Sequence, residues 1–384
     1  MSSMTSTTAV SQKNSNLGAA KATKNDEFYT QWADIEREMN AYLDYDPDVF
    51  RDKTILLPCD DPEWSNFAKF FALHFHDYGL KKLIATSYAP DSNPDLPSYQ
   101  PTLFETEAPQ FDATKTHSNG KLFVLDRDIN GDGVINIDDL QWEYLDGEGD
   151  FRSKEVTALR DEADIIITNP PFSLFREFVG WLRTGKKQFA IIGNGNAVTY
   201  KEVFPLIKAN QLQLWKGATG MVFGVPKGAT IKESDAAKAQ RLGYPPDENY
   251  DYTRLGNSCW FTNIEHGRRH EPMQLMTAAD NLRYNKKFIN TLDGAADYRR
   301  YDNFDAIEVP YSDAIPSDYD GVMGVPISFL DKLNPDQFDV VGYSRGEHCP
   351  DRLKIVGTGL DHSQPYIGGV AKYDRILIQR RADA

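Results

Sequence analysis

The feature that most constrains the fold is a run of three isoleucines at residues 165–167, which leads into Asn169-Pro170-Pro171-Phe172. A short apolar run of this kind is typical of a strand buried on both faces, as in parallel sheets covered by helices. Two successive prolines cannot continue a strand ladder, because neither residue has an N–H group. We therefore expect the strand to stop here, with Asn169 at its carboxyl end.

The tetrapeptide places two hydrogen-bond acceptors beside an aromatic ring. The prolines hold the backbone extended, so that the carbonyl of Pro170 lacks a ladder partner and the side-chain oxygen of Asn169 lies close to it. Two fixed acceptors can hold the hydrogens of an exocyclic amino group while the ring that carries this group stacks on Phe172. We predict Asn169, Pro170 and Phe172 as catalytic residues; the plainer alternative is a loop that happens to contain Pro-Pro.

Strand and helix patterns alternate around this motif and predict a doubly wound α/β sheet. An apolar strand at residues 54–58 is followed by Asp60 and Asp61, and then by aromatic residues at helical spacing. Further strands are predicted at residues 82–87 and 188–193. Ligands of such sheets bind at the carboxyl ends of the strands, so polar residues at these ends are candidates for a binding site.

The composition fits a globular chain long enough for two domains. Of its 384 residues 40% are hydrophobic, yet no apolar run approaches the roughly 18 residues that span a membrane. The first residues have no apolar core of the kind found in signal peptides. Three scattered cysteines argue against a disulfide framework or a zinc site. We therefore expect a cytoplasmic protein with no membrane partner.

The formal net charge of −15 argues at first against a nucleic-acid partner. Residues 91–164, however, contain 18 acidic and 6 basic residues, and so carry −12 of this charge. The remaining 310 residues carry only −3. The acidity is local, and a DNA-facing surface elsewhere on the chain stays compatible with the sequence.

Much of this acidic stretch reads as a surface insertion, at about residues 89–145, and it contains a loop with the spacing of a calcium site. Counted from Asp128 as position 1, Asn130 is at position 3, Asp132 at position 5 and Asp139 at position 12, with glycine at position 6. This pattern resembles the dockerin type of calcium loop. The four residues are a candidate structural calcium site, and an ion-free set of Asx-Gly turns is the alternative.

The alternation of strands and helices ends near residue 264. Two β-rich runs at residues 220–225 and 258–263 suit an antiparallel pair at the sheet edge. Residues 226–256 form a connection between them that is long enough to cover the pocket for the ring that stacks on Phe172. Residues 265–384 mix basic clusters with tyrosines and asparagines, which suits phosphate and base contacts and predicts an α+β recognition region. A merely solvated surface is the alternative, since this region has a net charge of −4. Residues 1–24 are predicted to be a disordered tail.

Over about residues 24–384 the chain resembles the EcoRI-type adenine-specific DNA methyltransferases. The segments that carry the resemblance, besides the tetrapeptide, are Asn25-Asp-Glu-Phe-Tyr-Thr, Pro58-Cys-Asp-Asp-Pro-Glu-Trp-Ser, residues 162–174 and Gly256-Asn-Ser-Cys-Trp-Phe-Thr-Asn263. The resemblance implies a seven-stranded class I methyltransferase sheet in a catalytic domain at residues 25–264. It also implies S-adenosylmethionine as donor and the N6 atom of adenine in double-stranded DNA as acceptor. The chain departs from most methyltransferases in having no glycine between Asp52 and Gly79.

The resemblance further implies that four segments hold S-adenosylmethionine. The first lines the methionine end, the second accepts hydrogen bonds from the ammonium group, the third binds the ribose hydroxyls, and the fourth binds the adenine ring. In that order the residues are Tyr29 and Thr30, Asp60 and Asp61, Thr86 and Ser87, and Asp150 and Phe151, with Asn169 beside them.

Three other functions stay open at this point. RNA adenine methyltransferases and protein glutamine methyltransferases carry the same tetrapeptide. A catalytically idle DNA-binding relative would also resemble the family, although the intact motif argues against it. A calcium-dependent interaction module would rest on residues 126–140 alone. The sequence reveals neither the recognition site nor a cognate restriction endonuclease.

Overall fold

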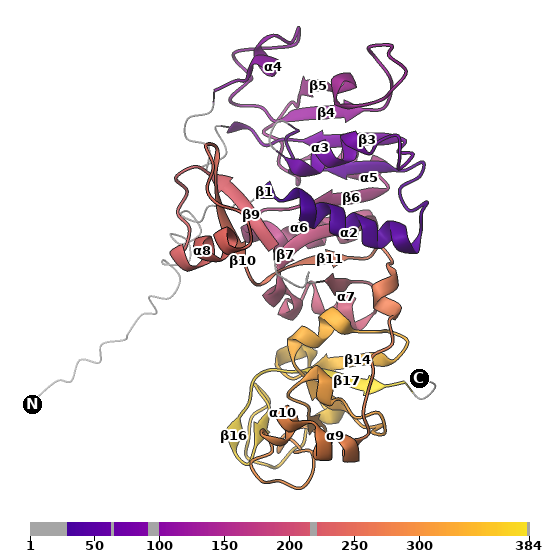
Figure 1. Ribbon diagram of the computed structural model, residues 1–384, viewed down its shortest axis with the longest axis vertical. Coiled ribbons are helices and arrows are strands. Elements are labelled where there is room, and N and C mark those ends of the chain that lie inside the picture. The colour runs from indigo at the N-terminus through magenta and orange to yellow at the C-terminus, as the bar shows by residue number, and fades with distance from the viewer. Residues whose placement is uncertain (1–28, 63–64, 91–99, 216–220, 382–384) are drawn as a thin grey trace, which may run out of the picture.

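The computed structural model describes residues 29–62, 65–90, 100–215 and 221–381, so the predicted tail at residues 1–24 lies outside it. Eight strands form the large sheet, in the order β5-β4-β3-β2-β6-β7-β11-β8 (Figure 1). Their bounds are β2 (Thr54–Leu57), β3 (Lys82–Thr86), β4 (Lys121–Leu125), β5 (Gln141–Tyr144), β6 (Ile165–Thr168), β7 (Gln188–Asn194), β8 (Gln213–Trp215) and β11 (Ser258–Thr262).

The centre of the sheet is parallel and buried on both faces. β2 pairs in parallel with β3 and β6, and β6 pairs in parallel with β7. Side chains alternate between two apolar clusters: Leu56 and Ile166 join one, whereas Ile55 and Ile165 join the other. The predicted central strand, with three consecutive isoleucines, is therefore confirmed, because each face of the sheet needs an apolar residue at every second position.

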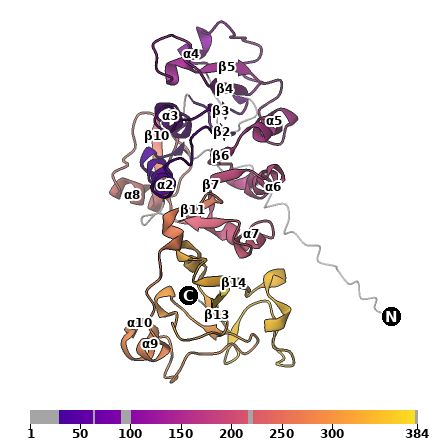
Figure 2. The same cartoon turned by 90° about the vertical axis from the view of Figure 1, so that its right-hand side faces the viewer.

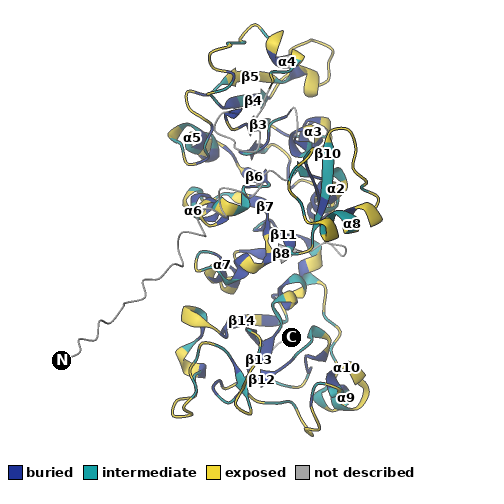
Figure 3. Ribbon diagram, turned by 90° about the vertical axis from the view of Figure 1, so that its left-hand side faces the viewer, coloured by how far each residue is buried: buried dark blue, intermediate teal, exposed yellow. Residues whose placement is uncertain are grey.

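Helices cover both faces of the sheet (Figure 2). On one side lie α2 (Trp32–Tyr45) and α3 (Asn66–Leu73), and on the other lie α5 (Lys154–Glu162), α6 (Phe175–Gly185) and α7 (Phe204–Lys208). Figure 3 shows the buried strands as a central layer between the two. The prediction of a mixed, doubly covered α/β sheet is confirmed. No helix in the described part of the chain is long and apolar enough to cross a membrane.

The described sheet has eight strands where seven were predicted. Residues of the acidic stretch form β4 and β5, which extend the sheet beyond β3 with antiparallel pairing. A buried ion pair fixes this extension, because Lys121 Nζ on β4 lies 2.8 Å from Glu105 Oε2 in α4 (Leu103–Thr106). The predicted insertion thus contributes to the sheet instead of lying on its surface.

The predicted pairing of residues 220–225 with 258–263 is wrong. The first run forms β9 (Met221–Pro226), which pairs with β1 (Tyr29–Thr30) and β10 (Tyr250–Leu255) in a separate small sheet. The second run forms β11, which lies antiparallel between β7 and β8. The connection also contains helix α8 (Glu233–Arg241). Local sequence indicates that such runs are extended, but not which strand each will pair with.

Residues beyond β11 form a second, four-stranded sheet in the order β12-β13-β17-β14, seen below the large sheet in Figure 1. The two sheets share one apolar cluster, in which the rings of Phe204 on α7 and Tyr343 lie 5.9 Å apart. The main elements of this region are α9 (Ala278–Tyr284), α10 (Lys286–Ile289), β12 (Ile307–Glu308), β13 (Met323–Val325), β14 (Phe338–Tyr343), β15 (Tyr366–Ile367), β16 (Val370–Ala371) and β17 (Ile376–Arg380).

Candidate active site

The predicted catalytic residues lie where β6 reaches the carboxyl edge of the large sheet. β6 ends at Thr168, after which Asn169 is half-buried and Pro170 is buried. Pro171 keeps the backbone extended, with φ −52° and ψ 123°, and a 3-10 turn from Phe172 then leads into α6. The predicted end of the strand is confirmed, and Asn169 lies at the rim of the sheet and not within its core.

The small sheet borders this motif. The half-buried ring of Phe172 meets the ring of Phe223 on β9 edge-on, with centroids 6.4 Å apart and planes at 89°. Phe223 is in turn the strand partner of Thr30 on β1. Paired residues of neighbouring strands point to the same face of a sheet, so Thr30 faces the side on which Phe223 meets the catalytic motif. Thr30 and Phe172, which are 142 positions apart in the chain, are thereby linked through Phe223.

The hydroxyl of Thr30 is the best sign of a ligand at this edge. Thr30 is 3% exposed, and its Oγ1 atom has no hydrogen-bond partner among the described residues. Its main-chain carbonyl is held by Asn66 Nδ2 at 2.8 Å. A buried polar atom without a partner is costly, which suggests that a ligand supplies one. Together with the carboxylates that follow β2, Asp60 and Asp61, it gives a donor and acceptor set that fits the methionine end of S-adenosylmethionine.

Asp60 lies just beyond β2 and is linked by hydrogen bonds to the catalytic strand. Its Oδ2 accepts a hydrogen bond from Thr168 Oγ1 at 2.6 Å, and its Oδ1 accepts one from Ser65 Oγ at 2.7 Å. Burial raises the pKa of Asp60 to about 6, against the opposing effect of the two hydroxyls. Asp61, which is half-buried, lies next to it in the chain. Both carboxyl groups are thus at the carboxyl end of β2, as predicted.

Thr86 and Ser87, predicted to bind ribose hydroxyls, are buried and already engaged within the protein. Thr86 Oγ1 donates to the carbonyl of Pro58 at 2.9 Å, and Ser87 Oγ accepts from the N–H of Lys121 at 3.2 Å. Tyr88 follows them and is 39% exposed. The roles of Thr86 and Ser87 toward a ribose stay predictions.

Glu148 is a candidate ligand-binding residue at the end of β3 that sequence reasoning missed. Its carboxylate lies close enough to Tyr88 to raise the pKa of that phenol, after burial as the larger cause, to about 12. The neighbouring Gly149 has φ +85°, and a Cβ there would collide with the carbonyl oxygen of Ser87. Glycine therefore lets the chain carry an acidic side chain to the end of β3. The pattern Gly147-Glu148-Gly149-Asp150 was the available signal.

Asp150 and Phe151 follow directly. Asp150 Oδ1 accepts hydrogen bonds from the backbone N–H and Nε of Arg152, at 2.7 and 2.9 Å, and these contacts lower the pKa of Asp150. Phe151 is 4% exposed and packs against Phe178 and Trp181 of α6, with centroids 4.9 and 5.6 Å away. These contacts make Phe151 a core residue, and its role as a cover for an adenine ring stays a prediction.

The prediction of a calcium site is not supported. The oxygens of the predicted ligands accept backbone N–H groups of their own loop, as when Asp128 binds Gly131 and Gly133 at 2.7 and 2.8 Å. Within the described ranges no group of three or more His, Cys, Asp or Glu residues could hold a metal ion. The loop is instead a series of Asx turns. The other predicted ligands accept similar bonds: Asn130 from Asp132, Asp132 from Val134, and Asp139 from Ile129, Asn130 and Asn136.

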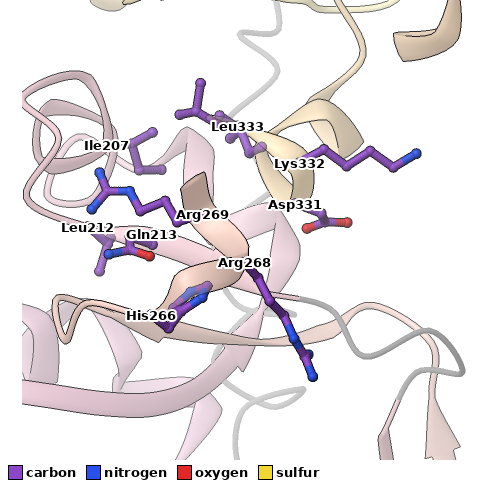
Figure 4. Close-up of a pocket in the computed structure, with 10 residues that line it drawn as sticks. Ile207, Leu212, Gln213, His266, Arg268, Arg269, Asp331, Lys332 and Leu333 are labelled. Atoms are coloured by element: carbon purple, nitrogen blue, oxygen red, sulfur yellow. The ribbon is translucent and has the colours of Figure 1, made fainter. Parts of the chain in front are cut away.

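A cavity of about 30 Å³ lies elsewhere, at the junction of the two sheets (Figure 4). Its walls come from α7, β8 and residues 266–269 on one side and residues 330–333 on the other. Burial lowers the pKa of His266, which lines it, to about 4. A space of this size suits an ordered water better than a substrate. The cavity does not include the catalytic motif.

Comparison with known proteins agrees with this geometry. The family described as adenine-specific methyltransferase EcoRI matches residues 16–381. The chain is 37% identical over 370 residues to Type II methyltransferase M.EcoRI of Escherichia coli, covering 95% of this chain and 96% of that protein. It is 32% identical to M.MpnI of Mycoplasma pneumoniae, covering 94% and 97% of the two chains, and 32% identical to M.MgeORF184P of Mycoplasma genitalium, covering 94% and 98%. No solved structure gives a significant match.

Proposed function

Since this chain belongs to the EcoRI family of adenine-specific methyltransferases, we propose that it transfers a methyl group from S-adenosylmethionine to the N6 atom of a specific adenine in duplex DNA. The observation that carries this proposal is Asn169-Pro170-Pro171-Phe172 at the carboxyl rim of the sheet, bordered by the small sheet that contains the unpartnered hydroxyl of Thr30. The motif supplies the means to grip an amino group, and the rim supplies a place for the donor.

In this mechanism the target adenine leaves the base stack, because N6 is inaccessible inside the duplex. Flipping costs a few kcal/mol, which contacts in the pocket must offset. Phe172 is the best stacking partner at the site, since its ring is half-buried. Tyr29 and Tyr200 are the other aromatic candidates for stacking on the base. One face of Tyr200 is already covered by the guanidinium of Arg176, 3.9 Å from the ring centroid, and Tyr29 packs edge-on against Tyr250.

Asn169 and Pro170 would then activate the amino group. The N6 lone pair is delocalised into the purine ring, which makes N6 a weak nucleophile. The side-chain oxygen of Asn169 and the carbonyl of Pro170 would accept its two hydrogens and stabilise positive charge as it develops on nitrogen. N6 gains the methyl group before it loses a proton, so no early general base is needed. S-adenosylmethionine, when bound, supplies the electrophilic methyl group on its sulfonium.

The chain's own residues would hold the donor at the ends of β2, β3 and β6. Thr30 would bind its methionine end, and Asp60 or Asp61 its ammonium group. Asp150 would bind the adenine ring of S-adenosylmethionine at the same edge of the sheet. The order of the strands supports a class I methyltransferase sheet, because β11 is inserted antiparallel between β7 and β8, which run parallel to β2, β3 and β6.

Residues 265–384 would provide target recognition, with residues 25–264 as the catalytic domain. The N-terminal half supplies the motif and the donor site, so a partner surface that selects sequence is expected in the remaining residues. The four-stranded sheet joins the catalytic part through the shared core, in which β14 contacts helix α7. A DNA-modifying protein of this kind is expected in the cytoplasm.

Product analysis tests the proposal. The protein is incubated with tritiated S-adenosylmethionine and, in parallel, with duplex DNA, RNA or a protein mixture, and the labelled residue is identified after digestion. We expect N6-methyladenine from duplex DNA alone. Label in RNA adenine or in protein glutamine, with none in duplex DNA, would refute the proposed substrate.

A further inference from the structure

One segment of the C-terminal region, residues 352–373, exposes several large apolar side chains to solvent. We call it the exposed segment. Val356 is 84% exposed, Val370 is 60% exposed and Tyr373 is 85% exposed. Ile355, at 37%, is the fourth exposed residue of this kind. Single exposed apolar residues are common on protein surfaces, but four within one short segment call for an explanation.

The backbone of the exposed segment is fixed by hydrogen bonds to two residues of the underlying chain, Asn303 and Asp302. Asn303, which is fully buried, donates from Nδ2 to the carbonyls of Asp361 and Gln364 at 2.7 and 2.8 Å, and its Oδ1 accepts the N–H of Tyr366 at 3.1 Å. Asp302 Oδ2 adds a bond from the N–H of Gly369 at 2.7 Å. A surface fixed in this way loses little conformational entropy when it binds a partner.

The charge of the exposed segment differs from that of the molecule. It contains three basic residues, Arg352, Lys354 and Lys372, and one acidic residue, Asp361, whereas the whole chain has a net charge of −15. Lys354 pairs with Asp351. Within the described part of the chain, Arg352 and Lys372 form no ion pair. Two cations are thus left for a negatively charged partner.

In the view of Figure 1, the exposed segment lies toward the same side as the catalytic rim, although the two are separated across the molecule in Figure 2. Figure 1 shows β16, which belongs to the segment, on the side that carries β1, β9 and β10. β9 borders the catalytic motif through the contact between Phe223 and Phe172. A partner that reaches both the motif and the exposed segment must therefore be wide enough to span this separation, as a duplex is.

We propose that the exposed segment is the part of the C-terminal region that reads the base sequence of duplex DNA, an inference that rests on the proposed function. Val356, Val370 and Tyr373 would contact base edges and thymine methyl groups in a groove. Arg352 and Lys372 would contact the flanking phosphates, which fix position without selecting sequence. Apolar side chains flanked by cations match the mixed apolar and anionic surface of a DNA groove.

The test compares single alanine variants of the full-length protein. The target sequence is first found by mapping methylated adenines in DNA from cells that express the parent. The ratio kcat/KM is then measured on a duplex with this sequence and on duplexes with one base pair changed. We expect Tyr373→Ala and Val356→Ala to lower kcat/KM on the target duplex by about 10- to 100-fold. The ratio of kcat/KM on the target to kcat/KM on a changed duplex should fall as well.

Leu103→Ala is the matched control, because Leu103 is 76% exposed but lies on α4, at the opposite end of the molecule in Figure 1. It should behave as the parent. Lys372→Ala should weaken binding to all duplexes alike and make the salt dependence shallower by about one unit of slope. Affinity for S-adenosylmethionine and melting temperature should stay at parental values in every variant.

Parental kcat/KM and discrimination in both Tyr373→Ala and Val356→Ala would overturn this inference and leave the proposed function standing, since the parent would still methylate DNA. A parent that labels only RNA or protein would reject the proposed function and the inference with it. A protein partner covering the segment would appear as parental DNA discrimination in the variants, which also counts against the inference.

Discussion

Thr168 shows how one hydroxyl group can join the two halves of the proposed site. It is fully buried as the last residue of β6, and its Oγ1 donates to Asp60 Oδ2 at 2.6 Å. Asn169 follows it immediately. Asp60 belongs to the segment predicted to hold the methyl donor, and Asn169 to the motif predicted to hold the adenine. The position of one group is therefore tied to that of the other.

Thr168→Val should test this link. Valine keeps the shape of threonine but leaves a buried oxygen of Asp60 without its donor, at a cost of about 1–3 kcal/mol. We expect kcat to fall by about 10- to 100-fold, with weaker binding of S-adenosylmethionine measured by calorimetry. Thr168→Ser restores the hydroxyl and should recover most of both. A serine variant as impaired as the valine variant would show that packing, not the hydrogen bond, matters at this position.

Asn169→Ala should separate chemistry from donor binding. The loss of one acceptor at the amino group should lower the single-turnover rate by at least about 10²-fold, because that contact acts on the charge that develops in the transition state. Affinity for S-adenosylmethionine should change little. The control is Asn40→Ala, at an exposed position of α2. Turnover of Asn169→Ala near the parental rate would contradict the assigned role.

Helix α2 carries a buried acid whose titration should appear in the stability of the protein. Glu38 is 1% exposed and accepts a hydrogen bond from Tyr42 at 2.6 Å, one helical turn away. Burial raises the pKa of Glu38 to about 7 from a usual value of 4.5. Between these values the folded state holds a proton that the unfolded state has released. Stability from this group is therefore full below pH 4.5 and is lost as the pH rises through 7.

Glu38→Gln should remove this dependence. The decline in free energy of unfolding between pH 5 and pH 7 should become shallower by up to about 1.4 kcal/mol per pH unit, as measured by urea unfolding at several pH values. Glu36→Gln alters an exposed residue of the same helix and should leave the parental slope. An unchanged slope in Glu38→Gln would mean that this carboxyl group does not titrate in that range.

The turn before Asp150 offers a pair of glycines that differ in both backbone conformation and surroundings. At Gly149 a side chain would meet the carbonyl of Ser87 in a backbone with φ +85°, whereas a Cβ at Gly147 would meet nothing within 4 Å. Gly149→Ala should cost about 1–3 kcal/mol of stability and should also weaken binding of S-adenosylmethionine by moving Asp150. Gly147→Ala should be near neutral in thermal unfolding and in binding. Equal behaviour of the two variants would disprove this reading of the turn.

At the scale of the whole molecule, the two sheets should unfold as one unit. A single apolar cluster includes Phe204 of the catalytic half and Tyr343, Val325 and Ile376 of the C-terminal half. Separating the halves would expose this cluster to water, at about 25 cal/mol for each Å² of apolar surface. The free energy of the shared core thus favours one cooperative transition over two.

The distribution of tryptophan makes this measurable. All six tryptophans lie between residues 32 and 260, so their fluorescence reports on the catalytic half, whereas far-ultraviolet circular dichroism reports on both halves. We expect the two urea transitions of the full-length protein to coincide, with a single midpoint. A second transition seen by circular dichroism alone would show that residues 265–384 unfold independently.

The sequence by itself determined the parts of the protein that depend on local chemistry. The isoleucine run identified a strand buried on both faces, the two prolines fixed its end, and the Asn169-Pro-Pro-Phe172 motif with its neighbours identified the family. These features follow from side-chain period and backbone geometry, which neighbours in the chain set without help from distant residues.

The tertiary structure alone decided the pairings between distant segments. β9 joined β1 and not β11, and the acidic stretch contributed strands to the sheet. The calcium-like loop satisfied its carboxylates with its own N–H groups. Thr30 and Phe172 came to one rim because of the pairing of Thr30 with Phe223. Which strand pairs with which depends on the free energy of packing the whole core, and no local pattern in the sequence encodes that sum.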